Sequence, residues 1–194
     1  MKEAKGFPYV DDIYLFNTGN ARRAYEVFGC HYLEDLKKHR FCVWAPNARS
    51  VSVVGDFNGW NPQADPMEND NGVWTAFIDD LKDGDNYKYS IWGYDGSTVL
   101  KADPFGVHCE VRPHTASKVW ALDGFTWTDE KFLKNRRTKK HFNAPMSIYE
   151  VHLGSWRRYP DGNYFDYEKL GTELSAYAVQ MGYTHIELLP VMEH

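Results

Sequence analysis

The hydrophobic pattern of the chain changes near Met146, and this change limits the folds that the chain can adopt. Between residues 39 and 122, short runs of β-branched and aromatic residues alternate with turns that contain Gly, Pro, Asn or Asp. About six or seven short strands at this spacing are typical of a β-sandwich of about 80 to 100 residues. From residue 146 onward, a strand, an amphipathic helix and a second strand indicate a βαβ unit. The sequence therefore predicts a mainly β fold that ends in a parallel strand pair.

The stretch FCVWAPNARSVSVVGDFNGW, residues 41–60, is the best-defined part of the predicted sandwich. Its alternating residues and its β-branched run predict two strands that are joined by a turn at Pro46 and Asn47. A loop rich in Gly, Asp and Asn follows and carries two large rings, Phe57 and Trp60. Aromatic rings are common in binding sites and in cores, so the sequence leaves both roles open for these rings.

The same signals predict further strands of the sandwich. They are expected at residues 72–79, 86–92, 98–102 and 117–122. Residues 93–97 read GYDGS, and Asp-Gly tolerates the positive φ that a hairpin turn needs. Residues 103–114 contain prolines and a glycine, which predict an irregular crossing loop.

Segments of a different kind flank the sandwich. Residues 1–38 show short helical patterns, so we predict a helical N-terminal segment there. Residues 123–145 are predicted to be a linker that includes the basic run KNRRTKK at residues 134–140. We interpret this run as a solvated face of the linker, with a polyanion-binding role as the alternative.

The region 146–194 contains the predicted βαβ unit. Strands are expected at residues 147–153 and 183–191, with a polar, aromatic loop after the first of them. Asp166 can cap the helix between them, and Gly182 can end it. The apolar positions of this helix follow steps of three and four: Tyr167, Leu170, Leu174, Tyr177, Ala178 and Met181. One such unit cannot cover both faces and the edges of its sheet, so we expect the start of a larger α/β domain.

Composition excludes some classes of partner. The net charge is −5 without a dense basic stripe, which argues against nucleic acid as the main partner. No run approaches 18 apolar residues, so no membrane span is predicted. Aromatic residues make up 16% of the chain, which suits a protein that binds flat, hydroxyl-rich ligands, because rings cover the apolar faces of sugars.

The cysteines indicate the compartment. Cys30, Cys42 and Cys109 are odd in number and far apart, so they form neither a disulfide framework nor a zinc motif. The N-terminus has no apolar signal core. Together these features predict a cytoplasmic protein, and no motif indicates a cofactor.

Four blocks of the sequence resemble consecutive blocks of bacterial 1,4-α-glucan (glycogen) branching enzymes. The blocks are FCVWAPNARSVSVVGDFNGWNP, KADPFGVHCEVRPHTASKVW, MSIYEVHLGSWRR and MGYTHIELLPVMEH. The GDFNGW part alone is less specific, because debranching enzymes and glycogen-sensing kinase subunits carry similar loops. By this resemblance, residues 39–122 form a carbohydrate-binding module of family 48, an immunoglobulin-like β-sandwich. Residues 146–194 form the first strand, helix and second strand of an α-amylase-type (β/α)8 barrel.

The resemblance implies a retaining transglycosylation in glycogen biosynthesis. An Asp nucleophile and a Glu acid cleave an α-1,4 linkage, and a 6-hydroxyl then accepts the chain to give an α-1,6 branch. In this family the catalytic carboxylates lie on later barrel strands, and a whole barrel needs roughly 250 residues. No catalytic residue is therefore assigned here, although the region carries several carboxylates: Asp161, Asp166, Glu187 and Glu193. We expect the chain alone to bind α-glucan (glycogen, amylose) at most, and to need the remainder of the barrel as its partner.

Two other functions remain open from the sequence. One is a stand-alone glycogen-binding module without catalysis, but such a module has no use for half-exposed barrel strands. The other is a fragment of an isoamylase-type debranching hydrolase. The block EVHLGSWRR argues against it, because debranching relatives usually carry a different first strand.

The resemblance also suggests glucan-binding residues. In glycogen-sensing relatives, a Trp of the GDFNGW-type loop and a Lys of the YKY-type strand contact glucan, and these positions match Trp60 and Lys88. A second stacking Trp follows the Asp-Gly turn in those relatives, where this chain has Ser97 and Thr98. Trp156 follows the first barrel strand, at the end where barrel active sites assemble, so it is a third candidate. The alternative for Trp156 is a structural wedge between the sandwich and the barrel.

Four polar residues of the predicted barrel strands are of types that can bind a metal ion. Glu150 and His152 share one strand face, as do His185 and Glu187. If the strands are neighbours, these side chains would cluster. We favour a hydrogen-bonded barrel interior over a metal site, so no metal ligand is assigned.

Overall fold

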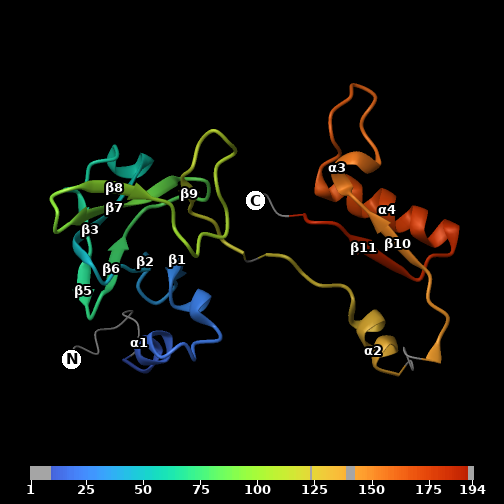
Figure 1. Ribbon diagram of the computed structural model, residues 1–194, viewed down its shortest axis with the longest axis horizontal. Coiled ribbons are helices and arrows are strands. Elements are labelled where there is room, and N and C mark those ends of the chain that lie inside the picture. Colours follow the sequence, from blue (N-terminus) through green and yellow to red (C-terminus); the bar gives the residue numbers. More distant parts are fainter. Residues whose placement is uncertain (1–9, 123, 139–142, 192–194) are drawn as a thin grey trace. The chain divides into compact units, whose positions relative to one another are not determined.

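The computed structural model describes residues 10–122, 124–138 and 143–191. The chain divides into two compact units, Met1–Thr126 and Trp127–His194. The first unit contains the antiparallel sheets, and the second contains a parallel strand pair with helices (Figure 1). No helix in the described part of the chain is long and apolar enough to cross a membrane.

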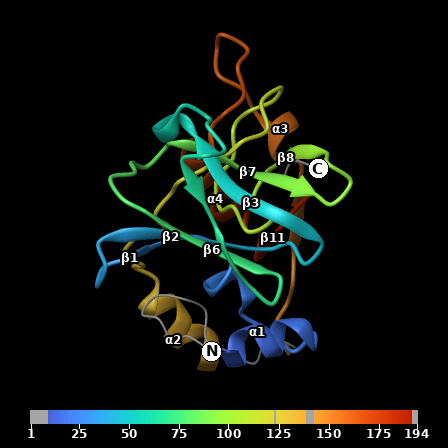
Figure 2. The same cartoon turned by 90° about the vertical axis from the view of Figure 1, so that its left-hand side faces the viewer.

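The first unit is a sandwich of two antiparallel sheets, which form separate layers in Figure 2. One sheet has the strand order β1 (Gly29–Leu33), β2 (Lys38–Trp44), β6 (Val73–Ile78) and β5 (Glu68–Asp70). The other has the order β4 (Asp65–Pro66), β3 (Ala48–Gly55), β7 (Asn86–Gly93) and β8 (Thr98–Lys101), with β9 (Ser117–Lys118) also paired to β7. The predicted sandwich is confirmed, as is the hairpin between β7 and β8.

The core of the sandwich is formed by side chains that alternate along the strands. Val51 and Val53 of β3 and Tyr87 and Tyr89 of β7 are buried in one cluster with Phe41 of β2. Because successive residues of a strand point to opposite faces, the residues between them lie on the outer face of the sheet. This outer face carries the residues that matter for the site: Ser50, Ser52, Lys88, Ser90 and Trp92.

A buried carboxylate anchors the loop after β8. The Asp103 side chain is only 6% exposed and accepts hydrogen bonds from the hydroxyls of Tyr87 (2.7 Å) and Tyr89 (3.0 Å). It also accepts one from the backbone N–H of Phe105 at 2.8 Å, and its own N–H donates to Ser117 Oγ at 2.9 Å. Burial raises the pKa of Asp103, although these donors oppose the shift.

The prediction of helix for residues 1–38 is only partly correct. Helix α1 (Val10–Asn17) and a 3-10 turn, η1 (Ala24–Glu26), are present, but strand β1 follows and pairs with β2. Phe28, directly before β1, is fully buried, and its ring centroid lies 4.3 Å from that of Phe16 in α1. The strand was missed because β1 is a short edge strand of mixed polarity, which only its pairing with β2 defines.

The predicted linker 123–145 contains a helix. α2 (Glu130–Thr138) includes the first part of the basic run, and none of its residues is buried. Good helix formers occupy most of its positions, Glu130 lies in the first turn, and Arg136 and Arg137 lie in the last. These charges complement the helix dipole, which explains a helix where a linker was expected. Residues 139 and 140 of the run lie outside the described residues.

The second unit is the predicted βαβ arrangement. Its parallel strands are β10 (Ile148–Val151) and β11 (His185–Leu188), and its helices are α3 (Leu153–Trp156) and α4 (Tyr167–Met181). The caps are as predicted, since Asp166 accepts from the Lys169 N–H at 2.8 Å and Gly182 ends α4 with φ +80°. Leu170, Leu174 and Ala178 are buried, whereas Tyr167 and Met181 of the predicted apolar face are exposed.

An apolar groove of about 610 Å³ lies between α4 and β11. Its lining includes Leu153, Leu170, Leu174, Ile186, Leu188 and Val191. Ile186, Leu188 and Val191 remain partly exposed. Helix α4 therefore leaves part of the apolar surface of β11 open.

Candidate glucan-binding site

Asn58 fixes the loop that follows β3. Its Oδ1 accepts from the Gly55 N–H at 2.9 Å, and its Nδ2 donates to the Val53 carbonyl at 3.0 Å and to Asp65 Oδ2 at 2.6 Å. One amide therefore ties the 3-10 turn η2 (Asp56–Asn58) both to β3 and to β4. This explains how a polar loop holds one conformation at the end of the sheet.

Trp60 ends this loop in a left-handed conformation with φ +61°. Its backbone N–H donates to the Gly55 carbonyl at 2.9 Å, and its indole Nε1 donates to Asp56 Oδ1 at 3.0 Å. The residue remains 37% exposed. A bulky residue in this region of φ is strained by about 1 to 2 kcal/mol. The loop tolerates this strain while its hydrogen bonds hold an exposed ring in one orientation.

The second ring of the loop has a different role. Phe57 packs against the sandwich core, and its ring centroid lies 6.4 Å from that of Phe41. The sequence left a core role and a binding role open for these rings, and Phe57 has the core role. Trp60 stays at the surface.

Lys88 lies at the same end of the sandwich as the Trp60 loop. It pairs with Val54, and the next pair in the register joins Tyr87 to Gly55, where the loop begins. The Lys88 ammonium donates to Thr115 Oγ1 at 2.8 Å. Strand register thus brings Lys88 near the loop, and its contact with glucan stays a prediction.

No aromatic ring occupies the positions after the Asp-Gly turn. The Ser97 N–H and hydroxyl both donate to Asp95 Oδ1, at 3.0 and 2.7 Å, and so hold the turn. Thr98 pairs with Trp92 on the neighbouring strand, and the Arg49 guanidinium lies 4.2 Å from the centroid of the Trp92 ring. The sequence interpretation did not include Trp92, because only the register of β7 with β8 places it beside Thr98.

Trp156 belongs to the other compact unit. Its Nε1 donates to the Tyr149 hydroxyl at 3.1 Å, its ring meets Tyr177 edge-on at 5.7 Å, and the Arg157 guanidinium lies 4.4 Å from its centroid. These contacts wedge the ring between β10 and α4. All of these contacts lie within the second unit, so they test neither sugar stacking by Trp156 nor a wedge against the sandwich, and its role stays a prediction.

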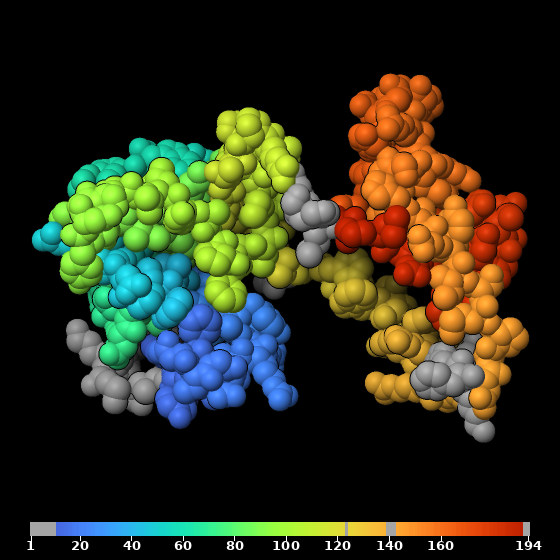
Figure 3. Space-filling model, in the orientation of Figure 1, coloured from blue at the N-terminus to red at the C-terminus, as the bar shows by residue number. Residues whose placement is uncertain are grey.

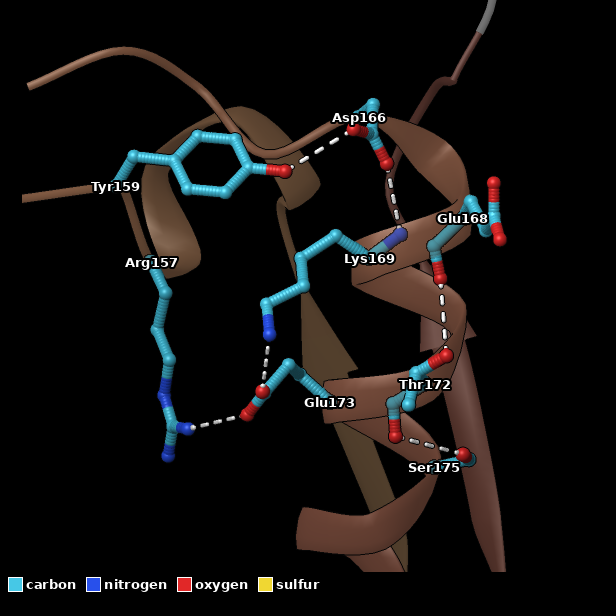
Figure 4. A network of polar contacts seen from close by, with 8 residues as sticks. All are labelled: Arg157, Tyr159, Asp166, Glu168, Lys169, Thr172, Glu173 and Ser175. Atoms are coloured by element: carbon cyan, nitrogen blue, oxygen red, sulfur yellow. Dashed lines mark hydrogen bonds and ion pairs between the residues drawn. The ribbon is translucent and has the colours of Figure 1, made fainter.

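Arg157 continues this packing into a polar network on α4 (Figure 4). Its guanidinium pairs with Glu173 at 3.5 Å, and Glu173 pairs with Lys169 at 2.8 Å. The hydroxyl of Tyr159 donates to Asp166 at 3.0 Å, next to the helix cap. The network ties the loop after β10 to the first turns of α4.

The carboxylates of this unit do not resemble a catalytic acid. The Lys169 N–H lowers the pKa of Asp166, Lys169 lowers that of Glu173, and the Asn163 N–H lowers that of Asp161. A general acid for glycoside cleavage instead needs a raised pKa. Glu193, which the sequence interpretation also weighed, lies outside the described residues.

Of the four polar residues of the barrel strands, the two histidines have local partners, and the two glutamates are neighbours in the strand register. Glu150 pairs with Glu187 in the register of β10 and β11. His152 Nδ1 lies 3.2 Å from Ser155 Oγ, and His185 Nδ1 lies 2.8 Å from Thr184 Oγ1. In the described ranges, no group of three or more His, Cys, Asp or Glu residues is arranged to hold a metal ion.

Comparison with known families and structures agrees with this architecture. Residues 27–106 match the family described as carbohydrate-binding module 48 (isoamylase N-terminal domain). The chain superposes on the glycogen-degrading pneumococcal virulence factor SpuA with a TM-score of 0.60, at 23% identity, over 86% of this chain and 20% of that one. It superposes on the GBS pullulanase SAP with a TM-score of 0.55, at 21% identity, over 86% and 24%. At these identities the superpositions show the fold alone.

Curated relatives are closer in sequence. The 1,4-alpha-glucan branching enzyme GlgB of Bacillus subtilis (strain 168) is 45% identical over 98% of this chain and 31% of the relative. The enzyme of the same name from Desulfitobacterium hafniense (strain Y51) is 47% identical over 95% and 30%. That from Rubrobacter xylanophilus is 50% identical over 94% and 26%. The chain therefore spans roughly 30% of the length of the curated relatives that it matches.

These similarities first define the class of the protein. The sandwich matches carbohydrate-binding module 48, and a βαβ unit follows it. The match begins at residue 27, in agreement with strand β1 as part of the sandwich. Over almost all of its length, the chain is similar in sequence to part of the bacterial enzymes named 1,4-alpha-glucan branching enzyme.

Proposed function

We propose that the chain is the N-terminal part of a 1,4-alpha-glucan branching enzyme and that its sandwich binds α-glucan through Trp60 and Lys88. One observation carries the binding proposal: the exposed indole of Trp60, a residue with backbone φ +61°, is held in one orientation by its hydrogen bond to Asp56. Such a ring can stack on the apolar face of a glucose unit, while the Lys88 ammonium donates to sugar hydroxyls. The identity of 45 to 50% with enzymes named for branching supports the α-glucan as the ligand.

The direct test is affinity electrophoresis of the 194-residue chain in gels that contain glycogen. Glycogen should retard the wild type, and Trp60→Ala should lose most of that retardation. Lys88→Ala should weaken it less, because the ammonium is a single polar contact. Trp44→Ala is a matched control, since Trp44 is also exposed but belongs to the other sheet. Unchanged retardation of Trp60→Ala would remove Trp60 from the site.

The reaction of the whole enzyme is part of the same proposal. It is a retaining transfer that cleaves α-1,4 linkages and forms α-1,6 linkages, with catalytic carboxylates that this chain does not contain. The lowered pKa values of Asp161, Asp166 and Glu173 do not suit the general acid of such a reaction, which needs a raised pKa. The chain alone should be inactive. New α-1,6 linkages after its incubation with amylose would contradict this.

The partner of the second unit is proposed to be the remainder of a (β/α)8 barrel. The apolar groove between α4 and β11 supports this, because further strands and helices of a barrel would bury Ile186, Leu188 and Val191. We also propose a cytoplasmic location. Cys30, Cys42 and Cys109 are free thiols, as in a reducing compartment.

A further inference from the structure

A second groove lies on the outer face of the sandwich, along β3, β7 and β8. Strand alternation directs Tyr87 and Tyr89 into the core, so Ser90 and Trp92 lie on the opposite face. The register pairs Ser90 with Ser52, and Trp92 with both Ser50 and Thr98. Side chains from three strands therefore form one continuous floor.

The segment that follows Trp60 forms a wall of this groove. Strand β4 pairs with β3 at Ser52 and Pro66, which fixes that segment beside the floor. Pro62, Gln63 and Pro66 line the groove, whose volume is about 440 Å³. In the space-filling view, the segment after Trp60 (teal) lies next to the green surface of β7 and β8 (Figure 3). The volume is within the range of small-molecule sites in proteins.

The lining of the groove suits a neutral, hydroxyl-rich ligand. Its lining residues carry four side-chain hydroxyls, one amide and one indole, and none has a formal charge. Two of the hydroxyl residues, Ser52 and Ser90, are only 8% and 6% exposed and lie at the floor. The hydroxyls belong to Ser50, Ser52, Ser90 and Thr98, and the amide belongs to Gln63. Hydroxyls and amides exchange hydrogen bonds with sugar hydroxyls in either direction, because each can donate and accept.

Trp92 supplies the apolar surface for such a ligand. It is 38% exposed, and the Arg49 guanidinium, 4.2 Å from the ring centroid, holds the ring in place. A ring fixed before binding loses less side-chain entropy when a ligand stacks on it. The groove thus combines a positioned ring with a polar floor.

The groove is continuous with the proposed site at Trp60. Lys88, Ser90 and Trp92 follow one another on the same face of β7, which corresponds to about 14 Å from the first to the last at a rise of about 3.4 Å per residue. The wall of the groove is the same segment that begins at Trp60. A linear chain of sugar units can therefore reach both places at once.

We infer that the groove of Trp92, Ser90, Ser52 and Gln63 is a second α-glucan subsite, which extends the site at Trp60 and Lys88 along the outer face of the sandwich. This inference rests on the proposed glucan-binding function. It predicts that longer linear glucans bind more tightly than short ones, because they occupy both subsites.

The test is isothermal titration of the 194-residue chain with maltoheptaose. Trp92→Ala should weaken binding about tenfold, as expected for loss of a buried aromatic contact, and Trp92→Phe should retain most of the affinity. Thr98→Arg, which fills the groove and leaves the indole in place, should also weaken binding. Tyr94→Ala is the matched control, because Tyr94 is 78% exposed on the adjacent turn and does not line the groove. Thermal unfolding of each variant checks its fold.

The indole N–H resonance of Trp92 gives a second readout that needs no loss of function. Trp92→Phe identifies the resonance by its absence, and maltoheptaose should shift it in the wild type. If Trp92→Ala binds like the wild type and the resonance does not move, while Trp60→Ala loses binding, the second subsite is wrong and the proposed function stands. If the wild type binds no maltoheptaose or glycogen, the proposed function is wrong, and the subsite is wrong with it.

Discussion

The carboxylate of Asp56 joins Trp60 to Asn86, two residues that lie 26 positions apart in the sequence. Oδ1 accepts the indole N–H of Trp60 at 3.0 Å, and Oδ2 accepts from Asn86 Nδ2 at 2.9 Å and from the Asn86 N–H at 3.2 Å. The orientation of the exposed ring therefore depends on where β7 begins. This relationship connects the packing of the sandwich to its proposed binding surface.

Replacement of Asp56 tests this link. Asp56→Ala should weaken glycogen retardation about fivefold, since the freed indole must be ordered again on binding, and should cost about 1 kcal/mol of stability. Asp56→Asn keeps an acceptor for the indole and should have a smaller effect on binding. Glu68→Ala, at an exposed carboxylate of β5, is the control. Normal binding by a folded Asp56→Ala protein would show that ring orientation does not matter.

Asp103 is expected to contribute strongly to the stability of the sandwich. Asp103→Ala would leave the buried hydroxyls of Tyr87 and Tyr89 without their acceptor, at a cost of about 2 to 4 kcal/mol. Asp103→Asn retains one carbonyl oxygen as an acceptor and should lose less. Urea unfolding followed by near-ultraviolet circular dichroism measures both changes. A loss below that of Glu68→Ala would contradict the role of this carboxylate.

The raised pKa of Asp103 predicts a pH dependence with a definite sign. Burial favours the neutral form in the folded protein, so its stabilising contribution is present below the unfolded pKa, near 3.8, and is lost as pH rises through the folded pKa. The stability of the wild type relative to Asp103→Asn should therefore fall as pH rises above 3.8. For Asp95, whose pKa is lowered by Ser97, the comparison with Asp95→Asn should give a slope of the opposite sign, and at lower pH: its contribution is present above the unfolded pKa, near 3.8, and is lost as pH falls through the folded pKa. Melting temperatures measured from below to above pH 3.8 test the sign of both slopes.

The sequence predicts those elements that depend on local signals. Alternation of apolar residues defines β2, β3, β6 and β7, and the caps Asp166 and Gly182 define α4, because each signal lies within a few residues of its effect. Strand β1 was missed, since a short edge strand of mixed polarity acquires its conformation from its partner. The helix α2 was missed for a different reason, because a charged run without apolar periodicity fits a linker as well as a helix.

The candidate site was predicted only as single residues. Trp60 and Lys88 follow from short motifs, but distant parts of the chain supply Asn86, which bonds to the Asp56 that holds the Trp60 ring, and Thr115, which accepts from Lys88. Trp92 was not singled out because nothing in its local sequence distinguishes it from a core ring. Register, which depends on the whole sheet, places it on the outer face.

The N-cap of α4 provides a test in the second unit. Asp166→Ala removes the acceptor for the Lys169 N–H and for the Tyr159 hydroxyl, so the first turn of α4 should open more often. Amide hydrogen exchange of that turn should be about fivefold faster than in the wild type. Glu168→Gln changes a carboxylate in the same turn without removing the cap, so it serves as the control. Equal exchange rates in Asp166→Ala and the control would show that the cap does not limit opening.

Limited proteolysis tests the division into two units. Helix α2 has no buried residue and contains the trypsin sites Lys134, Arg136 and Arg137. The strands of the sandwich, in contrast, are held by hydrogen bonds within two sheets and by one common core. Trypsin should therefore cut first in α2 or in the second unit and leave a resistant fragment that contains residues 29–101. Replacement of Lys134, Arg136 and Arg137 by Gln should slow that first cut without changing the resistant fragment. Mass spectrometry of the products identifies the sites, and early cleavage inside residues 41–60 would contradict the sandwich as the more stable unit.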